Sequence, residues 1–188
     1  MTWDHSLFLW LNFDGGAFLD SVMILISGKL TWLPLYALLL FMAWRKGGWR
    51  AVGIFALCVV VAVGLADMVS GIFKHTGPLK HLWESFPVRL RPMHTPDLEG
   101  LIHVIKGGGK YGTVSAHAAT TASIAILAAL TLRRRWLTIL LAVWVLSVSY
   151  SRIYLAYHFP QDILLGWCVG TLCAMPPYLC VLSRPGSA

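Results

Sequence analysis

Charged residues are scarce in this sequence. Only 12% of its 188 residues are Asp, Glu, Lys or Arg, whereas 57% are hydrophobic and the mean hydropathy is +0.70. A water-soluble domain of this length has too little interior to bury that much apolar surface. The composition therefore excludes an ordinary soluble domain and predicts an integral membrane protein.

Acidic residues are the rarest charged group, with 8 against 15 Lys and Arg and a formal net charge of +7. The basic residues form short clusters between apolar runs and no continuous basic helix, which argues against a nucleic-acid partner. Such clusters are typical of contacts with anionic lipid headgroups and of cytoplasmic loops. We therefore expect membrane lipids as partners, no nucleic acid and no obligate protein partner.

Cysteine is absent from the polar loops, where an extracytoplasmic disulfide or a metal site would normally form. The four cysteines lie in apolar stretches and are interpreted as small buried residues: Cys58, Cys168, Cys173 and Cys180. Zinc-like spacing is also missing, since the loop histidines are scattered: His75, His81, His94 and His103. We expect no metal and no cofactor.

No basic region precedes the first apolar patch, so a cleaved signal is not expected either.

Five apolar stretches approach the length of a membrane-spanning helix, which needs about 20 residues. They cover about 17–44, 49–73, 112–135, 136–150 and 160–182. Breaks at Ser27-Gly28-Lys29 and Pro34 make the first either one long kinked helix or a short helix followed by a spanning one. The N-terminal segment, about 1–16, is expected to lie along the membrane interface. The prediction is an all-α membrane bundle of about five to six transmembrane helices, forming a single domain over 1–188.

The basic clusters predict the orientation of this bundle, because short loops rich in Lys and Arg stay in the cytoplasm. Three clusters fall on one side of the five stretches: 45–50, 133–135 and Arg184. The loop 74–111 and the segment 151–162 then face the exterior or periplasm, and the chain is placed in the inner membrane. The outer loop is itself basic, but its charges have another use. Its glycine run, 107–109, lacks the context of a nucleotide-binding loop and is interpreted as a hinge.

The segment 151–162 concentrates ionisable residues where two apolar stretches meet, and such residues are costly at membrane depth and usually functional. Pro160 suits the first turn of a helix and makes Asp162 the next-turn neighbour of His158. A carboxylate on one ring nitrogen raises the basicity of the other, as a nucleophilic histidine requires. The alternative is an interfacial histidine beside a helix-start aspartate.

Two further segments suit phosphate chemistry. Ser115, Ala116 and His117 open a helix, whose N-terminal amides favour anions, so Ser115 and the Ala116 amide are candidates for phosphate binding and His117 for the general acid. The alternative is that Thr113 or Ser115 caps the helix and His117 packs. Arg91, in the run 89–92, suits a bidentate grip on phosphate; its alternative is a solvated charge cluster.

Taken in order, Arg-Pro, then Ser-x-His, then Ser-Arg-x5-His-x3-Asp, these motifs resemble the type 2 phosphatidic acid phosphatase superfamily over about 67–166. The superfamily includes undecaprenyl diphosphate phosphatases, lipid A phosphatases and vanadium haloperoxidases. The resemblance implies metal-free hydrolysis. It implies a phosphohistidine at His158, a partner in Asp162, an acid in His117, and phosphate binding by Lys74, Arg91, Ser115 and Arg152.

Two motifs depart from the family pattern. Val114-Ser115-Ala116-His117 stands where Pro-Ser-Gly-His is usual, although the Ala116 amide still provides a donor. The usual position of the first-motif lysine, seven residues before Arg91, holds Glu84. Lys74, at the end of an apolar stretch, is preferred for that role, with Lys80 as the alternative.

The expected function is removal of phosphate from a membrane lipid phosphate or diphosphate through a phosphohistidine. By analogy with the family and from the orientation, undecaprenyl diphosphate is the favoured substrate. Lipid A 1-phosphate, phosphatidylglycerol phosphate and phosphatidate are the alternatives. A different class, a small transporter with a buried network of Arg152, His158 and Asp162, would explain the charges in one segment, but not the other two motifs.

Overall fold

The computed structural model describes residues 2–73 and 89–182, so Lys74, Lys80 and Glu84 lie outside the described residues. The described α-helices are α1 (Trp3–Leu11), α2 (Gly16–Ser27), α3 (Leu33–Ile72), α5 (Ala116–Leu132), α6 (Arg135–Tyr154) and α7 (Pro160–Pro177). Short helical turns cover Leu30–Trp32, Pro92–His94, Pro96–Leu98 and Tyr178–Leu182. Within the described ranges, the only strand-like pairing is the bridge between Leu90 and Tyr111. The all-α prediction is confirmed for these residues.

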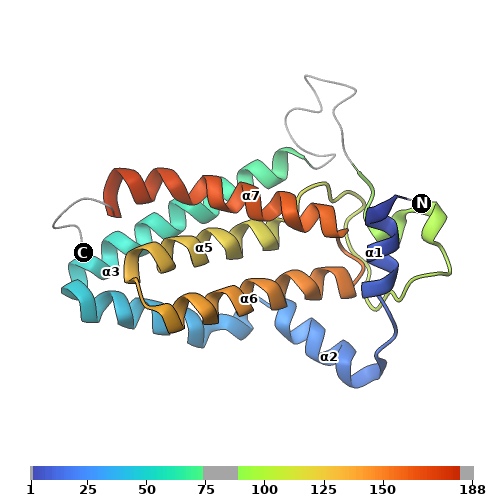
Figure 1. The fold of residues 1–188 in the computed structure, drawn as a ribbon, viewed down its shortest axis with the longest axis horizontal. Coiled ribbons are helices and arrows are strands. Elements are labelled where there is room, and N and C mark those ends of the chain that lie inside the picture. Colours follow the sequence, from blue (N-terminus) through green and yellow to red (C-terminus); the bar gives the residue numbers. More distant parts are fainter. Residues whose placement is uncertain (1, 74–88, 183–188) are drawn as a thin grey trace.

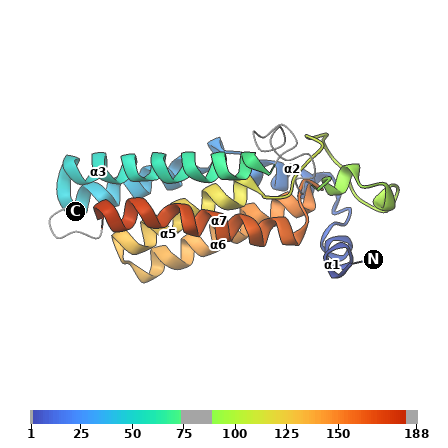
Figure 2. The same ribbon diagram turned by 90° about the horizontal axis from the view of Figure 1, so that it is seen from above.

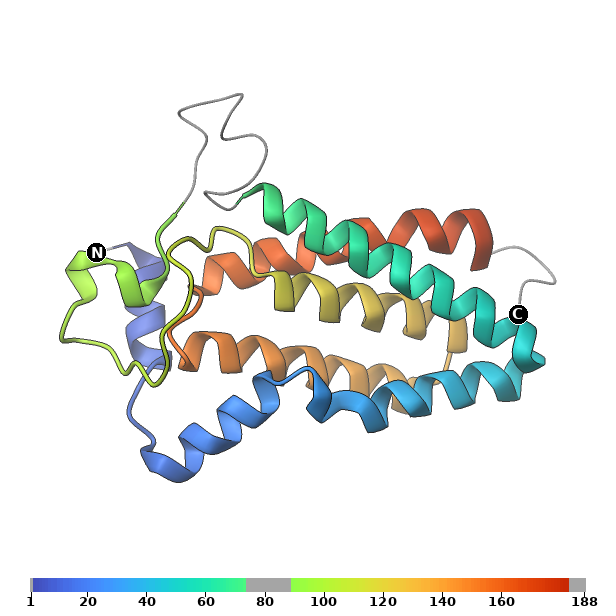
Figure 3. The ribbon, with the colours of Figure 1, turned by 180° about the vertical axis from the view of Figure 1, so that it is seen from behind.

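Helix α3 is a hairpin of two helical arms. Its helical geometry breaks at Gly47 and Gly48, and Gly48 has a φ of 65°, which glycine adopts without steric cost. The two arms run in opposite directions and diverge from the hairpin toward the other end of the bundle (Figures 1 and 3). This break falls between the first two apolar stretches of the sequence. The first stretch is itself divided, with α2 as a short helix before α3, as one of the two alternatives predicted.

Helix α5 lies at the centre and packs against α3, α6 and α7. Figure 2 shows the arms of α3 on one side of the layer formed by α5, α6 and α7. Two glycines of α7 bring it against the start of α5. A Cβ at Gly166 would lie 2.7 Å from the backbone carbonyl oxygen of Ser115, and one at Gly170 would lie 2.2 Å from that of Ala119. Small residues at such crossings are typical of membrane helices.

Three described helices are long and apolar enough to cross a membrane: Leu30–Ile72, Arg135–Tyr154 and Pro160–Leu182. A fourth candidate arises if α1 and α2, bent by 115°, count as one span. The sequence predicted five to six. Two physical reasons account for the difference: α3 combines two stretches across its hairpin, and α5 has only 17 residues because 112–115 are not helical.

Two of the three basic clusters predicted to be cytoplasmic share one end of the bundle, and the third, Arg184, lies outside the described residues. Lys46 Nζ donates to the Thr131 oxygen at 2.8 Å, which places the α3 hairpin beside the α5–α6 turn that carries Arg133, Arg134 and Arg135. The opposite end carries α1, the start of α5, the start of α7 and the loop 155–159 (Figures 1 and 3). We call this second end the site end.

Candidate active site

His158 lies at the site end, in the loop between α6 and α7, and only 3% of it is exposed. Its Nδ1 is 3.0 Å from the Gly112 carbonyl oxygen and 3.4 Å from Asp162 Oδ2. A carbonyl can only accept a hydrogen bond, so Nδ1 carries the hydrogen and the neutral ring presents the lone pair of Nε2. Nε2 has no hydrogen-bond partner among the described residues. Burial lowers the pKa of His158, and Asp162 partly opposes this shift.

The loop that carries His158 is closed by its own backbone. The amides of Tyr157 and His158 both donate to the Arg152 carbonyl, at 3.0 and 3.2 Å, and Ala156 adopts a φ of 55° to allow it. Pro160 then starts α7, and the fully buried Asp162 accepts from the Phe159 amide at 2.9 Å. A carboxylate in the first turn of a helix is favoured by the helix dipole. The closed loop and the helix start at Pro160 thus hold Asp162 beside His158.

Ser115 has the capping role that the sequence left as an alternative. It is the N-cap of α5, its Oγ accepts from the Ala118 amide at 3.4 Å, and it is fully buried. Its own amide donates to the Asp162 carbonyl at 3.1 Å, which ties the second motif to the third. The amides of Ala116 and His117 open the helix and have no hydrogen-bond partner among the described residues. These two amides are free to donate to an anion.

Two arginines flank one aromatic ring. The guanidinium carbon of Arg152 is 4.2 Å from the centre of the Tyr157 ring, and that of Arg91 is 5.6 Å from it. Arg91 Nε donates to the Tyr111 carbonyl at 3.2 Å, and Arg152 donates to the Ser27 hydroxyl. Arg152 Nε is buried without a partner among the described residues. A buried donor of this kind is costly unless a ligand satisfies it.

The candidate residues from three distant segments therefore share one environment. His117 interacts electrostatically with Arg152, Lys29, His158 and Arg91. His158 interacts in the same way with Asp162, Arg152 and Arg91. The structure brings these predicted residues together at the site end, within range of one another's electrostatic interaction. Lys74, predicted to join them, lies outside the described residues.

Gly112 was not singled out by the sequence, because its importance is steric. A Cβ on Gly112 would lie 2.8 Å from Arg91 Cγ and 3.2 Å from His158 Nδ1. Gly108, interpreted from the sequence as part of a hinge, is also tightly packed: a Cβ there would lie 2.6 Å from Tyr157 Cε1 and 2.9 Å from Arg91 Nη1. Both glycines let the segment 89–115, which we call the outer segment, approach the site closely.

Substituting Gly112 with alanine is expected to displace the His158 ring and lower kcat by about 10- to 100-fold, since small misplacements of reacting groups have effects of this size. The matched control is Gly53→Ala in α3, where an added Cβ meets no atom within 4 Å. Phosphate release and thermal melting are measured for both variants. A Gly112→Ala enzyme as active as the Gly53→Ala enzyme would show that this close contact has no catalytic importance.

A cavity of about 580 Å³ leads away from the cluster into the bundle. Its polar lining residues are Ser27, Lys29, Asp67, Thr120, Thr121 and His117, and the rest of its wall is mostly apolar, from α3, α5 and α6. His117 and Ser27, the partner of Arg152, connect the cavity to the cluster of cations. An amphiphile with an anionic head and an apolar tail matches this distribution. Sequence reasoning did not find Lys29, which precedes Leu30–Trp32.

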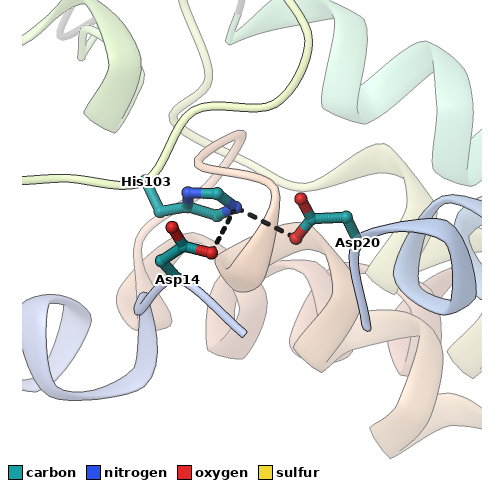
Figure 4. Close-up of side chains that lie close together, drawn as sticks. All are labelled: Asp14, Asp20 and His103. Atoms are coloured by element: carbon teal, nitrogen blue, oxygen red, sulfur yellow. Dashed lines mark hydrogen bonds and ion pairs between the residues drawn. The ribbon is translucent and has the colours of Figure 1, made fainter. Parts of the chain in front are cut away.

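A second polar cluster joins the outer segment to α2 and α6 (Figure 4). His103 Nε2 is 3.0 Å from Asp20 Oδ1 and 4.0 Å from Asp14 Oδ1, and Tyr154 donates to Asp20 at 2.7 Å. Within the described ranges, Asp14, Asp20 and His103 form the group whose geometry could hold a metal, with ligand atoms all within 4.8 Å of one another. The buried Asn12 adds hydrogen bonds to the backbone of His103 and Tyr154, so the cluster fastens the outer segment in place.

Two arginines within electrostatic range of a histidine with a free ring nitrogen, at one end of an apolar bundle, indicate a membrane phosphatase. The sequence profile of the PAP2 superfamily matches residues 55–185, and the chain belongs to that superfamily. The prediction of a lipid phosphatase is thereby confirmed.

Three relatives are informative. The chain is 33% identical over 174 residues to a lipid A 4'-phosphatase of Bacteroides thetaiotaomicron, covering 89% of this chain and 72% of the relative. It is 27% identical over 170 residues to an undecaprenyl-diphosphatase of Sulfolobus acidocaldarius, covering 88% and 72%. The crystal structure of a PAP2-type phosphatidylglycerolphosphate phosphatase from Bacillus subtilis matches 93% of this chain and 82% of that one, with a TM-score of 0.63 and 20% identity. This last likeness shows the shared fold.

Proposed function

We propose that this membrane phosphatase removes the 4'-phosphate of a lipid A-type saccharide lipid at the outer face of the cytoplasmic membrane. One observation carries the proposal: His117, which lines a largely apolar cavity, interacts electrostatically with His158, Arg91 and Arg152. The choice of lipid A is supported by the 33% identity to a lipid A 4'-phosphatase. Undecaprenyl diphosphate, favoured from the sequence, becomes the second candidate, because the undecaprenyl-diphosphatase relative is 27% identical.

In the proposed first step, His158 Nε2 attacks phosphorus in line with the bond to the lipid oxygen. The N–P bond forms as the P–O bond breaks, and His117 gives its proton to the departing oxygen. Arg91, Arg152 and the Ala116 amide stabilise the charge on the equatorial phosphate oxygens, with Lys74 as the further cation implied by the family motif. Ser115 supports this step by capping α5 and orienting the two free amides.

In the second step, water attacks the phosphohistidine. The new O–P bond forms as the N–P bond breaks, inorganic phosphate leaves, and His117 takes the proton from water. The phosphorylated His158 ring is cationic, and its Nδ1–H remains hydrogen-bonded to the Gly112 carbonyl and faces Asp162, both of which stabilise that charge. Neither step requires a metal.

The orientation is supported by the distribution of charge. The bundle end opposite the site carries Lys46 and the run 133–135, and short basic loops of this kind stay in the cytoplasm. Five crossings follow if the two arms of α3 are counted separately with α5, α6 and α7. At 1.5 Å per residue, the 17 residues of α5 span about 26 Å, close to the thickness of the hydrocarbon core. Helices α1 and α2 then lie at the outer surface.

The test is a substrate panel for the purified protein in detergent: lipid A, undecaprenyl diphosphate, phosphatidylglycerol phosphate and phosphatidate. We expect the highest kcat/KM for lipid A, with mass spectrometry showing loss of the 4'-phosphate, and inhibition by vanadate, which mimics five-coordinate phosphorus. Faster hydrolysis of undecaprenyl diphosphate would establish the second candidate. Loss of the 1-phosphate would refute the stated position, and no release from any lipid would refute the proposed function.

A further inference from the structure

Asp162 needs a positive partner to remain ionised beside His158. Its side chain is 1% exposed, and a buried carboxylate is stable as an anion only when it is paired and hydrogen-bonded. The Phe159 amide supplies one hydrogen bond to Oδ2, and Arg89 Nη2 forms an ion pair with Oδ1. Arg89 is therefore the cation that directly balances the carboxylate next to the nucleophile.

Arg89 is held from several sides. Its Nη1 donates to Asp4 Oδ2 at 2.7 Å and to Gln161 Oε1 at 3.3 Å. Its guanidinium carbon is 4.5 Å from the centre of the Phe159 ring. Its backbone is fixed too, because its amide donates to Thr113 Oγ1 at 2.9 Å. Arg89 thus has a defined position relative to α1, α7 and the segment before α5.

Asp4 brings the N-terminal helix into this arrangement. It is 2% exposed, and its Oδ1 accepts from the Gln161 amide at 2.9 Å while Oδ2 accepts from Arg89. Two rings of α1 also pack on Phe159, with His5 stacked at 4.8 Å and Phe8 edge-on at 5.2 Å. Helix α1 is therefore seated directly on the loop that carries His158.

We propose that Arg89, anchored by Asp4 of α1, is a positioning residue that keeps Asp162 ionised and aimed at Nδ1 of His158. The inference rests on the proposed function, because it assigns His158 as the nucleophile. This role is distinct from phosphate binding. The guanidinium of Arg89 donates hydrogen bonds to Asp4, Gln161 and Asp162. Arg91 and Arg152, in contrast, lie beside the Tyr157 ring. Arg89 acts on the reaction through Asp162.

The effect of removing Arg89 on protonation has a definite sign. The groups facing His158 are Asp162, Arg152, Arg91 and His117, with Arg89 behind Asp162. Loss of a positive charge raises the affinity of the His158–Asp162 pair for a proton. The nucleophile must be deprotonated at Nε2. The fall of kcat at acidic pH, the acid limb of the pH profile, therefore moves to higher pH. A purely structural defect lowers the amount of active enzyme and leaves the limb where it is.

The experiment compares Arg89→Gln, Arg89→Lys and Asp4→Asn in the full chain. For Arg89→Gln we expect kcat to fall about 10- to 100-fold from the loss of positioning, and the acid limb to rise by roughly one pH unit. Arg89→Lys keeps the charge, so its limb stays close to that of the wild type and part of the activity returns. Asp4→Asn removes a negative charge and loosens Arg89, so kcat falls without any upward movement of the limb. Arg45→Gln, near the α3 hairpin, is the matched control and keeps normal activity.

A second readout does not depend on turnover. NMR titration of the His158 ring in histidine-labelled protein is expected to show a higher apparent pKa in Arg89→Gln than in the wild type and in Arg45→Gln. An unchanged limb and an unchanged titration in folded Arg89→Gln would overturn the inference. If the wild type releases phosphate from no lipid, the proposed function fails, but the NMR titration still decides whether Arg89 controls the pair. Melting curves identify a variant that does not fold, in which case Arg89→Lys and Asp4→Asn supply the comparison.

Discussion

Replacement of His158 by glutamine is expected to lower phosphate release by at least about 10⁴-fold, the scale on which loss of a nucleophile acts in other hydrolases. Glutamine keeps much of the volume of the ring and can still donate to the Gly112 carbonyl, so the packing around the loop is preserved. It has no nitrogen lone pair to attack phosphorus. The loss therefore falls on the chemical step and spares the fold.

The measurement is single-turnover hydrolysis of ³²P-labelled lipid, with folding checked by melting and gel filtration. The matched control is His103→Gln. That histidine pairs with Asp20 in the separate cluster of Figure 4 and is not assigned a part in the reaction, so its variant is expected to stay active. A folded His158→Gln enzyme with a normal rate would remove His158 from the role of nucleophile and with it the proposed mechanism.

Replacement of His117 by alanine is expected to have different effects on the two candidate substrates. Release of lipid A from its 4'-phosphate requires protonation of a sugar oxygen, a poor leaving group, so loss of the general acid costs about 10²- to 10⁴-fold. With undecaprenyl diphosphate the leaving group is undecaprenyl monophosphate, which is a weaker base and departs with less need for a proton. With that substrate the first step continues, while the second step, which needs His117 to take a proton from water, becomes slow.

His117→Ala is therefore expected to accumulate phosphohistidine on undecaprenyl diphosphate. The adduct is sought by mass spectrometry under alkaline conditions, where phosphohistidine survives, and the rates on both substrates are compared. The double variant His117→Ala, His158→Gln is the control and should carry no phosphate. Equal losses on both substrates, without a trapped adduct, would contradict the assignment of His117 as the proton donor to the leaving group.

Much of this fold follows from short-range signals. Hydropathy marks the apolar stretches, including the division between the first two at which α3 turns, and Pro160 marks the start of α7. The spacing of four residues between His158 and Asp162 correctly predicted that these two side chains would be neighbours. Each of these signals depends on residues within a few positions of one another, which is why sequence reasoning finds them.

The contacts that complete the candidate site are of another kind. The Gly112 carbonyl that selects the His158 tautomer is 46 residues away from it, and Arg89 is 85 residues from Asp4 and 73 from Asp162. Every residue has a carbonyl oxygen, so the sequence does not show which one binds His158. It also does not show which glycine is crowded by its neighbours in the fold. Arg89 stands in a visible basic run, but nothing in that run distinguishes its ion pairs from the role of Arg91.

Ser115 illustrates the same limit. Its residue type suited phosphate binding and helix capping equally, and the folded chain uses its hydroxyl as the cap of α5 and its amide to hold α7. The apolar cavity is also invisible in sequence, since its wall is assembled from α2, α3, α5 and α6, which meet only in the bundle.

The sequence alone is enough to show that this is a helical membrane protein, roughly where its apolar helices lie, and which residue types are available for phosphate chemistry. Those properties depend on composition and on local backbone preferences. Three features became visible only in the folded protein: which nitrogen of His158 is free, which arginine balances Asp162, and how α1 is joined to the loop that carries His158. These depend on hydrogen bonds and ion pairs between distant segments, whose geometry is set by helix packing.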